Sequence, residues 1–175
     1  LPKQGREIIA QKESEHQFIE ITERDGVRYL STDGGFGTQS IYDKNKFTTG
    51  SYYDYFMLLP YLIKKNKPIN VLIFVLAGAT IARGLNSEFG ENVKLEGVEV
   101  DPTVIELSKK YLDLNDIPVS IHETDGRVFL QSSHNKYDII MVDAYQNEFH
   151  IPWIMTTKEF WQLVDSQLEN DGIMA

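Results

Sequence analysis

Three carboxylates stand where short apolar runs of the sequence end, and their positions suggest a shared task. Glu99 and Asp143 come at the ends of two such runs, and Asp125 follows a third, residues 118–122. The carboxyl ends of parallel strands meet at the edge where an α/β sheet binds its ligand. Because carboxylates accept hydrogen bonds from hydroxyl and amino groups, the three acids predict a polar ligand at that edge.

A stretch of small residues precedes Glu99 by about twenty positions. The branched apolar run 71–76 gives way to Ala-Gly-Ala-Thr at residues 77–80 and then to an amphipathic stretch. This is the layout of a βαβ nucleotide site, in which small residues let the backbone approach the ligand and an acid binds the ribose hydroxyls. The pattern favours a nucleoside-bearing cofactor held by Glu99, and the alternative is a solvated acid at a strand terminus.

The other strand-end acids leave more than one interpretation open. Asp125 can cap the helix that follows it, bind an adenine amino group, or do both. Asp101 precedes Pro102, a pair that also serves as a plain helix entry. Nothing in folding demands a carboxylate at Asp143, which favours a role in the site.

Tyrosines offer a further set of candidates. Tyr52, Tyr53 and Tyr55 are first interpreted as the buried face of a helix, and second as the lining of an acceptor pocket. Tyr145 and Gln146 follow Asp143 in a loop that we expect to cover the pocket.

Composition and missing motifs narrow the function classes. The formal charge of −9 argues against a nucleic-acid backbone as partner. The absence of cysteine excludes disulfides and thiolate sites and fits a reducing, cytoplasmic location, in a cytoplasmic protein or the cytoplasmic domain of a longer one. His122 and His150 lack partners at metal-ligand spacing, so we expect no metal. There is no Gly-x-Ser-x-Gly elbow and no Walker loop.

The first third of the chain predicts small antiparallel hairpins. Residues 18–22, 27–30 and 39–42 are short strand-like runs separated by turns containing Asp-Gly. Residues 1–16 are polar, and we expect no regular structure there. From residue 51 the apolar spacing becomes helical, with Pro60 expected to kink or shorten the helix.

From residue 68 onward, strand and helix patterns alternate, which predicts a parallel, doubly wound sheet with its first strand central. Asn170, Asp171 and Gly172 are interpreted as a helix stop. We divide the chain into a β-hairpin domain, 1–50, and a Rossmann-like domain, 51–175. The expected strands are 70–76, 94–100, 118–122, 137–143 and 172–175, and the expected helices are 80–88, 102–114, 125–132 and 156–169.

The order of these motifs resembles the spermidine/spermine synthase family over roughly residues 17–175. A small hairpin domain before a Rossmann-like, methyltransferase-type sheet belongs to the same resemblance. The segments that carry it are Gln39, Tyr52-Tyr53-Asp54 with Pro60, Glu99-Val100-Asp101-Pro102, Asp125-Gly126-Arg127, Val142-Asp143 and Thr157-Lys158-Glu159-Phe160.

The resemblance implies aminopropyl transfer from decarboxylated S-adenosylmethionine to a polyamine-like amine, without a metal. It implies that Glu99 holds the ribose, Asp125 the adenine, and that Asp143 helps to deprotonate the attacking amine. The cofactor-binding residues are then Gln39, Gly78, Glu99, Asp101, Asp125 and Gly126, and the substrate-binding residues are Tyr52, Asp54, Tyr145 and Gln146.

Several positions depart from the family pattern. The family loop Gly-Gly-Gly-Asp-Gly is replaced by Val-Leu-Ala-Gly-Ala at 75–79, so the acid that would bind the donor's amino group is missing. Ala144 follows Asp143 where a polar run with a second acid is usual, and Tyr53 stands in place of a common histidine. S-adenosylmethionine and methyl transfer therefore remain alternatives, as does a non-catalytic nucleoside-binding or assembly module. We also expect the sheet to continue beyond residue 175 and the protein to be a homo-oligomer.

Overall fold

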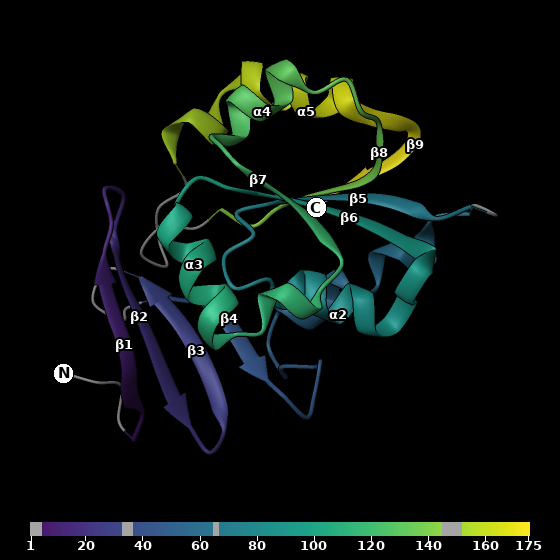
Figure 1. The fold of residues 1–175 in the computed structure, drawn as a ribbon. Helices are drawn as coiled ribbons and strands as arrows, with labels where there is room; N and C mark the ends of the chain where they lie inside the picture. The colour runs from purple at the N-terminus through teal and green to yellow at the C-terminus, as the bar shows by residue number, and fades with distance from the viewer. Residues whose placement is uncertain (1–4, 33–36, 65–66, 145–151) are drawn as a thin grey trace.

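The computed structural model describes residues 5–32, 37–64, 67–144 and 152–175, which form two sheets with helices packed around the second (Figure 1). The first sheet is antiparallel, in the order β1-β2-β3-β4. The predicted hairpins are confirmed. The strands are β1 (Glu7–Glu13), β2 (Phe18–Arg24), β3 (Val27–Thr32) and β4 (Gly37–Asp43).

The expectation that residues 1–16 lack regular structure is wrong for β1. Gln11 pairs with Glu20 of β2 in the backbone ladder, and the Gln11 side chain donates to the Glu20 carboxylate at 2.7 Å. The strand lies at the sheet edge, where charged residues such as Lys12 and Glu13 discourage pairing with another chain. Its sequence lacks a clear alternation of apolar and polar residues, because β1 buries neither of its faces. Pairing with β2 holds the strand in place.

A short helical segment connects the two sheets. It consists of α1 (Tyr53–Phe56) and the 3₁₀ helix η1 (Leu59–Leu62), with Pro60 in the first turn of η1. The predicted interruption at Pro60 is therefore confirmed. Of the three tyrosines expected on a buried face, only Tyr53 is buried, whereas Tyr52 is 47% and Tyr55 73% exposed.

The second sheet is parallel, in the order β7-β6-β5-β8-β9, so the predicted central strand is confirmed. Helices α2 and α3 cover one face and α4 and α5 the other (Figure 1). The strands are β5 (Ile69–Phe74), β6 (Val93–Glu99), β7 (Val119–Glu123), β8 (Tyr137–Val142) and β9 (Leu168–Met174). The helices are α2 (Thr80–Phe89), α3 (Pro102–Tyr111), α4 (Gly126–Ser132) and α5 (Lys158–Gln167), with 3₁₀ turns η2 (Gly90–Asn92), η3 (Leu114–Asp116) and η4 (Trp153–Thr156).

Strand β5 shows why its sequence is a continuous apolar run. Val71 and Ile73 pack into the core beneath α2, while Leu72 and Phe74 pack into the core beneath α4 and α5. A strand covered on both faces needs apolar side chains at every position rather than at alternate ones.

The predicted helix stop at Asn170, Asp171 and Gly172 is wrong. Helix α5 ends at Gln167, and the next residues enter β9. The ladder pairs Tyr137 with Leu168 and then Ile139 with Ile173, so the turn residues form an irregular excursion within the strand. Asn, Asp and Gly favour turns both at the end of a helix and at an irregularity within a strand. The sequence alone therefore does not distinguish the two.

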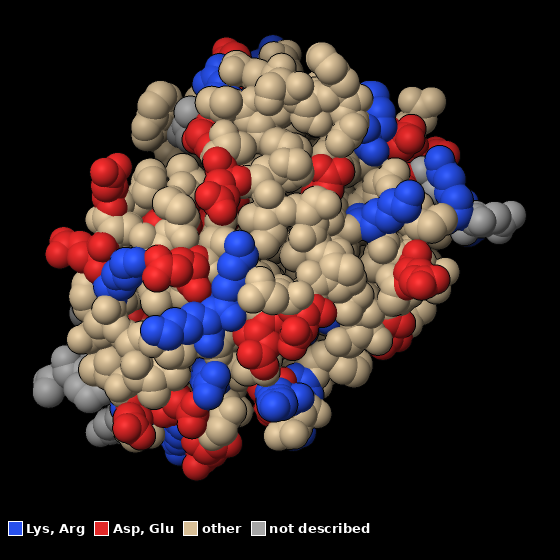
Figure 2. All heavy atoms as spheres, in the orientation of Figure 1, with Lys and Arg blue, Asp and Glu red and all other residues tan. Residues whose placement is uncertain are grey.

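A third core joins the two sheets. Ile19, Ile21 and Leu30 pack against Val104 and Leu107 of α3, which places the first sheet beside the carboxyl edge of the second. Acidic and basic side chains are interspersed over the face drawn in Figure 2. Within the described ranges, no helix is long and apolar enough to cross a membrane. The domain division at residue 50 stays a prediction.

Candidate functional site

A pocket of about 180 Å³ lies where the carboxyl ends of the parallel strands face the first sheet. The second sheet contributes the strand ends and the loops after them, and the first sheet forms the opposite wall. Residues 1–50 contribute Gln17, Leu30, Thr32 and Gln39 to the lining. The rest of the chain contributes Phe74, Val75, Ala77, Val98, Glu99, Val100, Val104, Thr124, Asp125, Gly126, Ala144, Pro152 and Met155.

Glu99 is the most firmly held carboxylate in this pocket. Its side chain is only 4% exposed, and its two oxygens accept hydrogen bonds from Ala77 N–H at 3.0 Å and Asp101 N–H at 3.1 Å. Burial raises the pKa of Glu99, and the two backbone hydrogen bonds oppose that rise. Each carboxylate oxygen retains a second lone pair, so Glu99 can accept hydrogen bonds from a pair of ligand hydroxyls.

The loop between β5 and α2 has an unusual backbone. Val75, Ala77 and Ala79 have φ values of 56°, 47° and 62°, which L-residues rarely adopt. Their alternation with Leu76 and Gly78 folds the backbone closely around the end of β5, and Leu76 N–H bonds Val98 O at 3.0 Å. This loop keeps a conformation suited to glycine while carrying side chains, so its geometry comes from the surrounding structure.

Gly78 turns away from the pocket. Its N–H donates to Ser40 Oγ at 2.7 Å, and a Cβ atom there would lie 2.5 Å from Leu112 Cδ1. The position therefore has no room for an acidic side chain. Gly78 is not among the residues that line the pocket, so its predicted contact with a cofactor stays a prediction.

Asp125 and Gly126 line the pocket at the start of α4. Asp125 caps the helix through one oxygen, Oδ1, which accepts from Arg127 N–H at 2.9 Å and Val128 N–H at 3.0 Å. Its capping role is thus confirmed, and it leaves Oδ2 in a position to serve a ligand. A Cβ atom at Gly126 would lie 2.9 Å from the Phe74 ring, so only glycine allows this close approach.

Asp101 connects the two sheets instead of lining the pocket. It is fully buried, caps α3 through Thr103 N–H at 2.9 Å, and accepts from Ser14 Oγ at 2.6 Å and Gln17 Nε2 at 3.3 Å. Gln17 itself lines the pocket. Neither Ser14 nor Gln17 was predicted from the sequence: Ser14 falls in the segment 1–16 that was expected to be irregular, and a lone glutamine before a strand carries no signal of a site.

Asp143 forms a pair with Tyr52 of the connecting segment. The Tyr52 hydroxyl donates to Asp143 Oδ2 at 2.8 Å. Burial raises the pKa of Asp143, and the Tyr52 hydrogen bond lowers it in part. The pKa of Tyr52 is raised by burial first and then by Tyr53 and Asp143, so its hydroxyl stays protonated and keeps donating.

A second pocket, of about 400 Å³, opens on the Tyr52 side of this pair. Tyr53 stacks obliquely on Tyr52, with ring centroids 4.2 Å apart, and burial raises the pKa of Tyr53 to about 12. Gln39 is common to the linings of both pockets. The second pocket is lined by Gly37, Thr38, Gln39, Ile41, Ser51, Tyr52 and Tyr53.

Asp54 stabilises a loop rather than lining either pocket. Its carboxylate accepts from the backbone N–H groups of Thr49, at 2.9 Å, and Gly50, at 2.8 Å, and from the Thr49 hydroxyl. The predicted residues Tyr145 and Gln146 lie outside the described residues.

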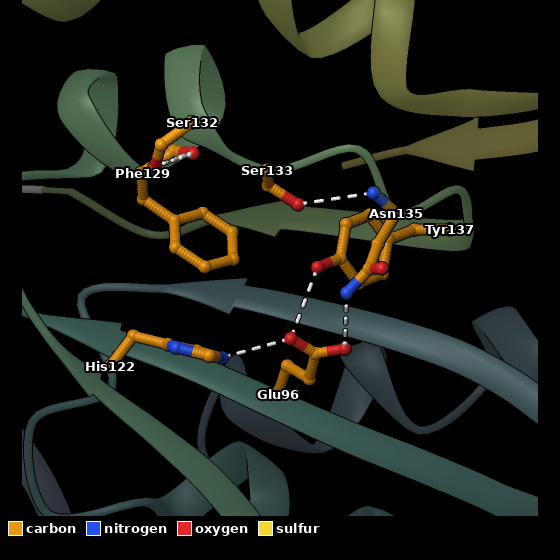
Figure 3. A network of polar contacts seen from close by, with 7 residues as sticks. All are labelled: Glu96, His122, Phe129, Ser132, Ser133, Asn135 and Tyr137. Atoms are coloured by element: carbon orange, nitrogen blue, oxygen red, sulfur yellow. Dashed lines mark hydrogen bonds and ion pairs between the residues drawn. The ribbon is translucent and has the colours of Figure 1, made fainter.

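His122 belongs to a separate polar cluster (Figure 3). Its Nε2 lies 2.9 Å from Glu96 Oε2, and the same carboxylate accepts from Tyr137 OH at 3.2 Å and Asn135 Nδ2 at 3.3 Å. Its ring packs on Phe129 with centroids 4.6 Å apart. The cluster ties β6, β7 and the chain after α4 together, which agrees with an ordinary structural histidine. The described residues contain no group of three potential metal ligands.

Polyamine aminopropyltransferases are found among the proteins similar to this chain in sequence, and spermidine synthases among those similar in structure. The family model "Spermine/spermidine synthase domain" matches residues 88–175. The chain is 37% identical over 163 residues to a probable polyamine aminopropyl transferase of Bifidobacterium longum, covering 93% of this chain and 35% of the relative. It is 31% identical over 173 residues to polyamine aminopropyltransferase 1 of Aquifex aeolicus, covering 95% and 58%. The chain thus spans less than two thirds of these relatives.

Two solved structures share the fold over nearly the whole chain. A probable spermidine synthase from Corynebacterium glutamicum superposes with a TM-score of 0.79 at 18% identity, covering 94% of this chain and 62% of that one. A spermidine synthase in complex with the transition state analogue AdoDATO gives 0.76 at 25% identity, covering 96% and 57%. The Rossmann-like sheet with its antiparallel companion is therefore the fold predicted from the sequence.

Proposed function

Because the chain belongs to the spermine/spermidine synthase family, we propose that it transfers an aminopropyl group from decarboxylated S-adenosylmethionine to a polyamine-like amine. The observation that carries this proposal is the hydrogen-bonded pair of Tyr52 and Asp143. Tyr52 lines the second pocket, and Ala144, the residue after Asp143, lines the first. A carboxylate at this junction can act on an amine in one pocket that attacks a carbon in the other.

In the proposed complex, the first pocket holds the nucleoside. Glu99 is fixed by two backbone hydrogen bonds and accepts the ribose hydroxyls, and Asp125 offers Oδ2 to the adenine amino group. The apolar wall, which includes Phe74, Val98 and Met155, suits the faces of a flat base. This division of polar edges and apolar faces is the usual composition of a nucleoside pocket.

The proposed reaction is a direct displacement. The neutral amine attacks the methylene carbon next to the sulfonium, a C–N bond forms, and the C–S electron pair leaves with the thioether product. The amine gives up its proton to the Asp143 carboxylate, whose raised pKa makes it a better proton acceptor than an exposed aspartate. Holding the amine and the sulfonium in line supplies much of the acceleration.

One observation makes S-adenosylmethionine, with methyl transfer, the second candidate, because it removes the feature that would reject this donor. The tight contacts around Gly78 leave no space for an acid in the loop. An acid there would attract the amino group of a decarboxylated donor and repel the carboxylate of the undecarboxylated one. Without it, the loop does not discriminate electrostatically between the two donors.

Incubation with each donor in turn and with 1,4-diaminobutane tests both candidates. Mass spectrometry should detect the aminopropylated amine together with methylthioadenosine, and Asp143→Asn should abolish both products. A methylated amine together with S-adenosylhomocysteine would favour the second candidate. If neither donor yields a product while the protein binds methylthioadenosine, the transferase proposal fails and a nucleoside-binding module is the better account.

A further inference from the structure

The side chain of Thr80, the first residue of helix α2, contacts the outer edge of the first sheet. Among the described residues β4 is the last strand of its sheet, so its outer edge has no neighbouring strand there. At Ile41, the backbone N–H donates to Thr80 Oγ1 at 2.9 Å, and the same hydroxyl donates to Ile41 O at 3.0 Å. The threonine hydroxyl thus replaces the partner that a further strand would supply.

Ser40 makes a second connection one residue earlier in β4. Its hydroxyl donates to Gln39 O at 2.7 Å and accepts from Gly78 N–H at 2.7 Å, in an environment where Ser40 is 1% exposed. This contact binds β4 to the loop that has three residues at positive φ. A buried hydrogen bond of this kind is costly to leave unmade, so it fixes the spacing of strand and loop.

A third contact holds the strand at Thr38. The Tyr53 hydroxyl donates to Thr38 O at 2.8 Å. Residues 38, 40 and 41 are therefore each held by a side chain or a backbone group from outside the first sheet. Gln39 lies between them and is the residue that the linings of the two pockets share.

We propose that Ser40 and Thr80 are positioning residues, which hold Gln39 at the junction of the two pockets so that it contacts the bound nucleoside. This inference rests on the proposed function. The two hydroxyls touch no ligand in this proposal. They act by fixing the backbone at residues 40 and 41, directly after Gln39, relative to the loop 75–79 and the start of α2, so that the Gln39 amide is oriented before the ligand binds.

Variants at Thr80 separate the hydroxyl from the shape of the side chain. Thr80→Val keeps the shape and loses both hydrogen bonds to Ile41, whereas Thr80→Ser keeps the hydroxyl. Thr22→Val is the matched control, because Thr22 is a buried threonine of β2 in the first sheet, and its hydroxyl has no hydrogen-bond partner among the described residues. Binding of methylthioadenosine is measured by calorimetry at a temperature where each variant is fully folded by circular dichroism.

We expect Thr80→Val to weaken nucleoside binding about tenfold, the factor that corresponds to one hydrogen bond of typical strength. Thr80→Ser should stay within about twofold of the unmodified protein, as should Thr22→Val. If Thr80→Val fails to fold, Ser40→Ala takes its place, with the same expected weakening. Equal affinity of the folded hydroxyl-deficient variant and the unmodified protein overturns the inference.

A double-mutant cycle tests whether the effect passes through Gln39. In the background of Gln39→Ala, adding Thr80→Val should weaken binding by less than about twofold, because the residue that it positions is already gone. A full additional tenfold loss would show that Thr80 acts on the ligand by another route and would overturn the role assigned to Gln39. If the unmodified protein binds no nucleoside at all, the proposed function itself fails, which is a distinct result.

Discussion

The carboxylates Glu99 and Asp125 and the loop 75–79 border the same pocket, yet their geometries are fixed in different ways. Asp125 is oriented by backbone N–H groups two and three residues away in the chain, and one of the two donors to Glu99 is the N–H of Asp101. The loop instead holds three L-residues at positive φ and depends on Ser40, 38 residues before Gly78 in the sequence. The carboxylates that offer polar contacts are thus oriented largely by neighbours in the chain. The loop between them has a strained backbone whose conformation depends on a residue distant in the sequence.

The largest expected effect is at Asp143, which belongs to neither of these regions. Asp143→Asn should lower the rate of transfer by at least about a hundredfold, because it removes the group that accepts the proton. Nucleoside affinity should change little, because Asp143 is proposed to contact the acceptor amine. Steady-state rates and calorimetric affinities of the same preparation check this, and a parallel loss of affinity would assign Asp143 to the nucleoside instead.

Glu99→Gln should weaken the binding of methylthioadenosine by about 1.5–3 kcal/mol, the range for hydrogen bonds to a charged group. The substitution keeps the size of the side chain and removes the charge that accepts two hydroxyls. Calorimetry measures the change. Glu96→Gln is a suitable control, because Glu96 lies on the same strand in the cluster of Figure 3 and outside the pocket lining. Equal losses for both variants would point to a general effect on β6.

The backbone strain of the loop can be tested by replacing alanine with glycine at two positions, one in the loop and one in helix α2. Ala79→Gly should stabilise the protein by about 0.5–1 kcal/mol, because glycine adopts positive φ without a steric penalty. Ala82→Gly, in helix α2 and equally buried, should destabilise it by about 1 kcal/mol. Urea unfolding of both variants gives the two free energies. Destabilisation by Ala79→Gly as large as that by Ala82→Gly would show that the loop carries no such strain.

Tyr52→Phe should have the smallest effect, a shift of the pH–rate profile in one direction. The Tyr52 hydrogen bond lowers the pKa of Asp143, so its removal raises that pKa further above the usual range. Because the carboxylate is the active form of a base, the acidic limb of the pH–rate profile should move to higher pH. The profile of transfer rate against pH measures this. An unmoved acidic limb would mean that Asp143 is not the titrating base.

The parts of the molecule that could be predicted from the sequence depend on neighbours in the chain. The parallel strands were recognisable from apolar runs, and the capping role of Asp125 from its place before a helix. The contacts of Asp101 were not, since its partners Ser14 and Gln17 lie more than 80 residues away in the chain. Strand β1 was not either, because its sequence lacks an alternating apolar pattern and its pairing with β2 holds it in place. Asn170-Asp171-Gly172 predicts a turn, but whether that turn ends a helix or interrupts a strand depends on the pairing of β8 with β9.

Titration of the unmodified chain with methylthioadenosine is the most direct test of the central claim, that the pocket beside Glu99 holds a nucleoside. The account predicts saturable binding with one nucleoside per chain, weakened by Glu99→Gln and retained by Asp143→Asn. The absence of measurable heat at millimolar nucleoside would contradict it.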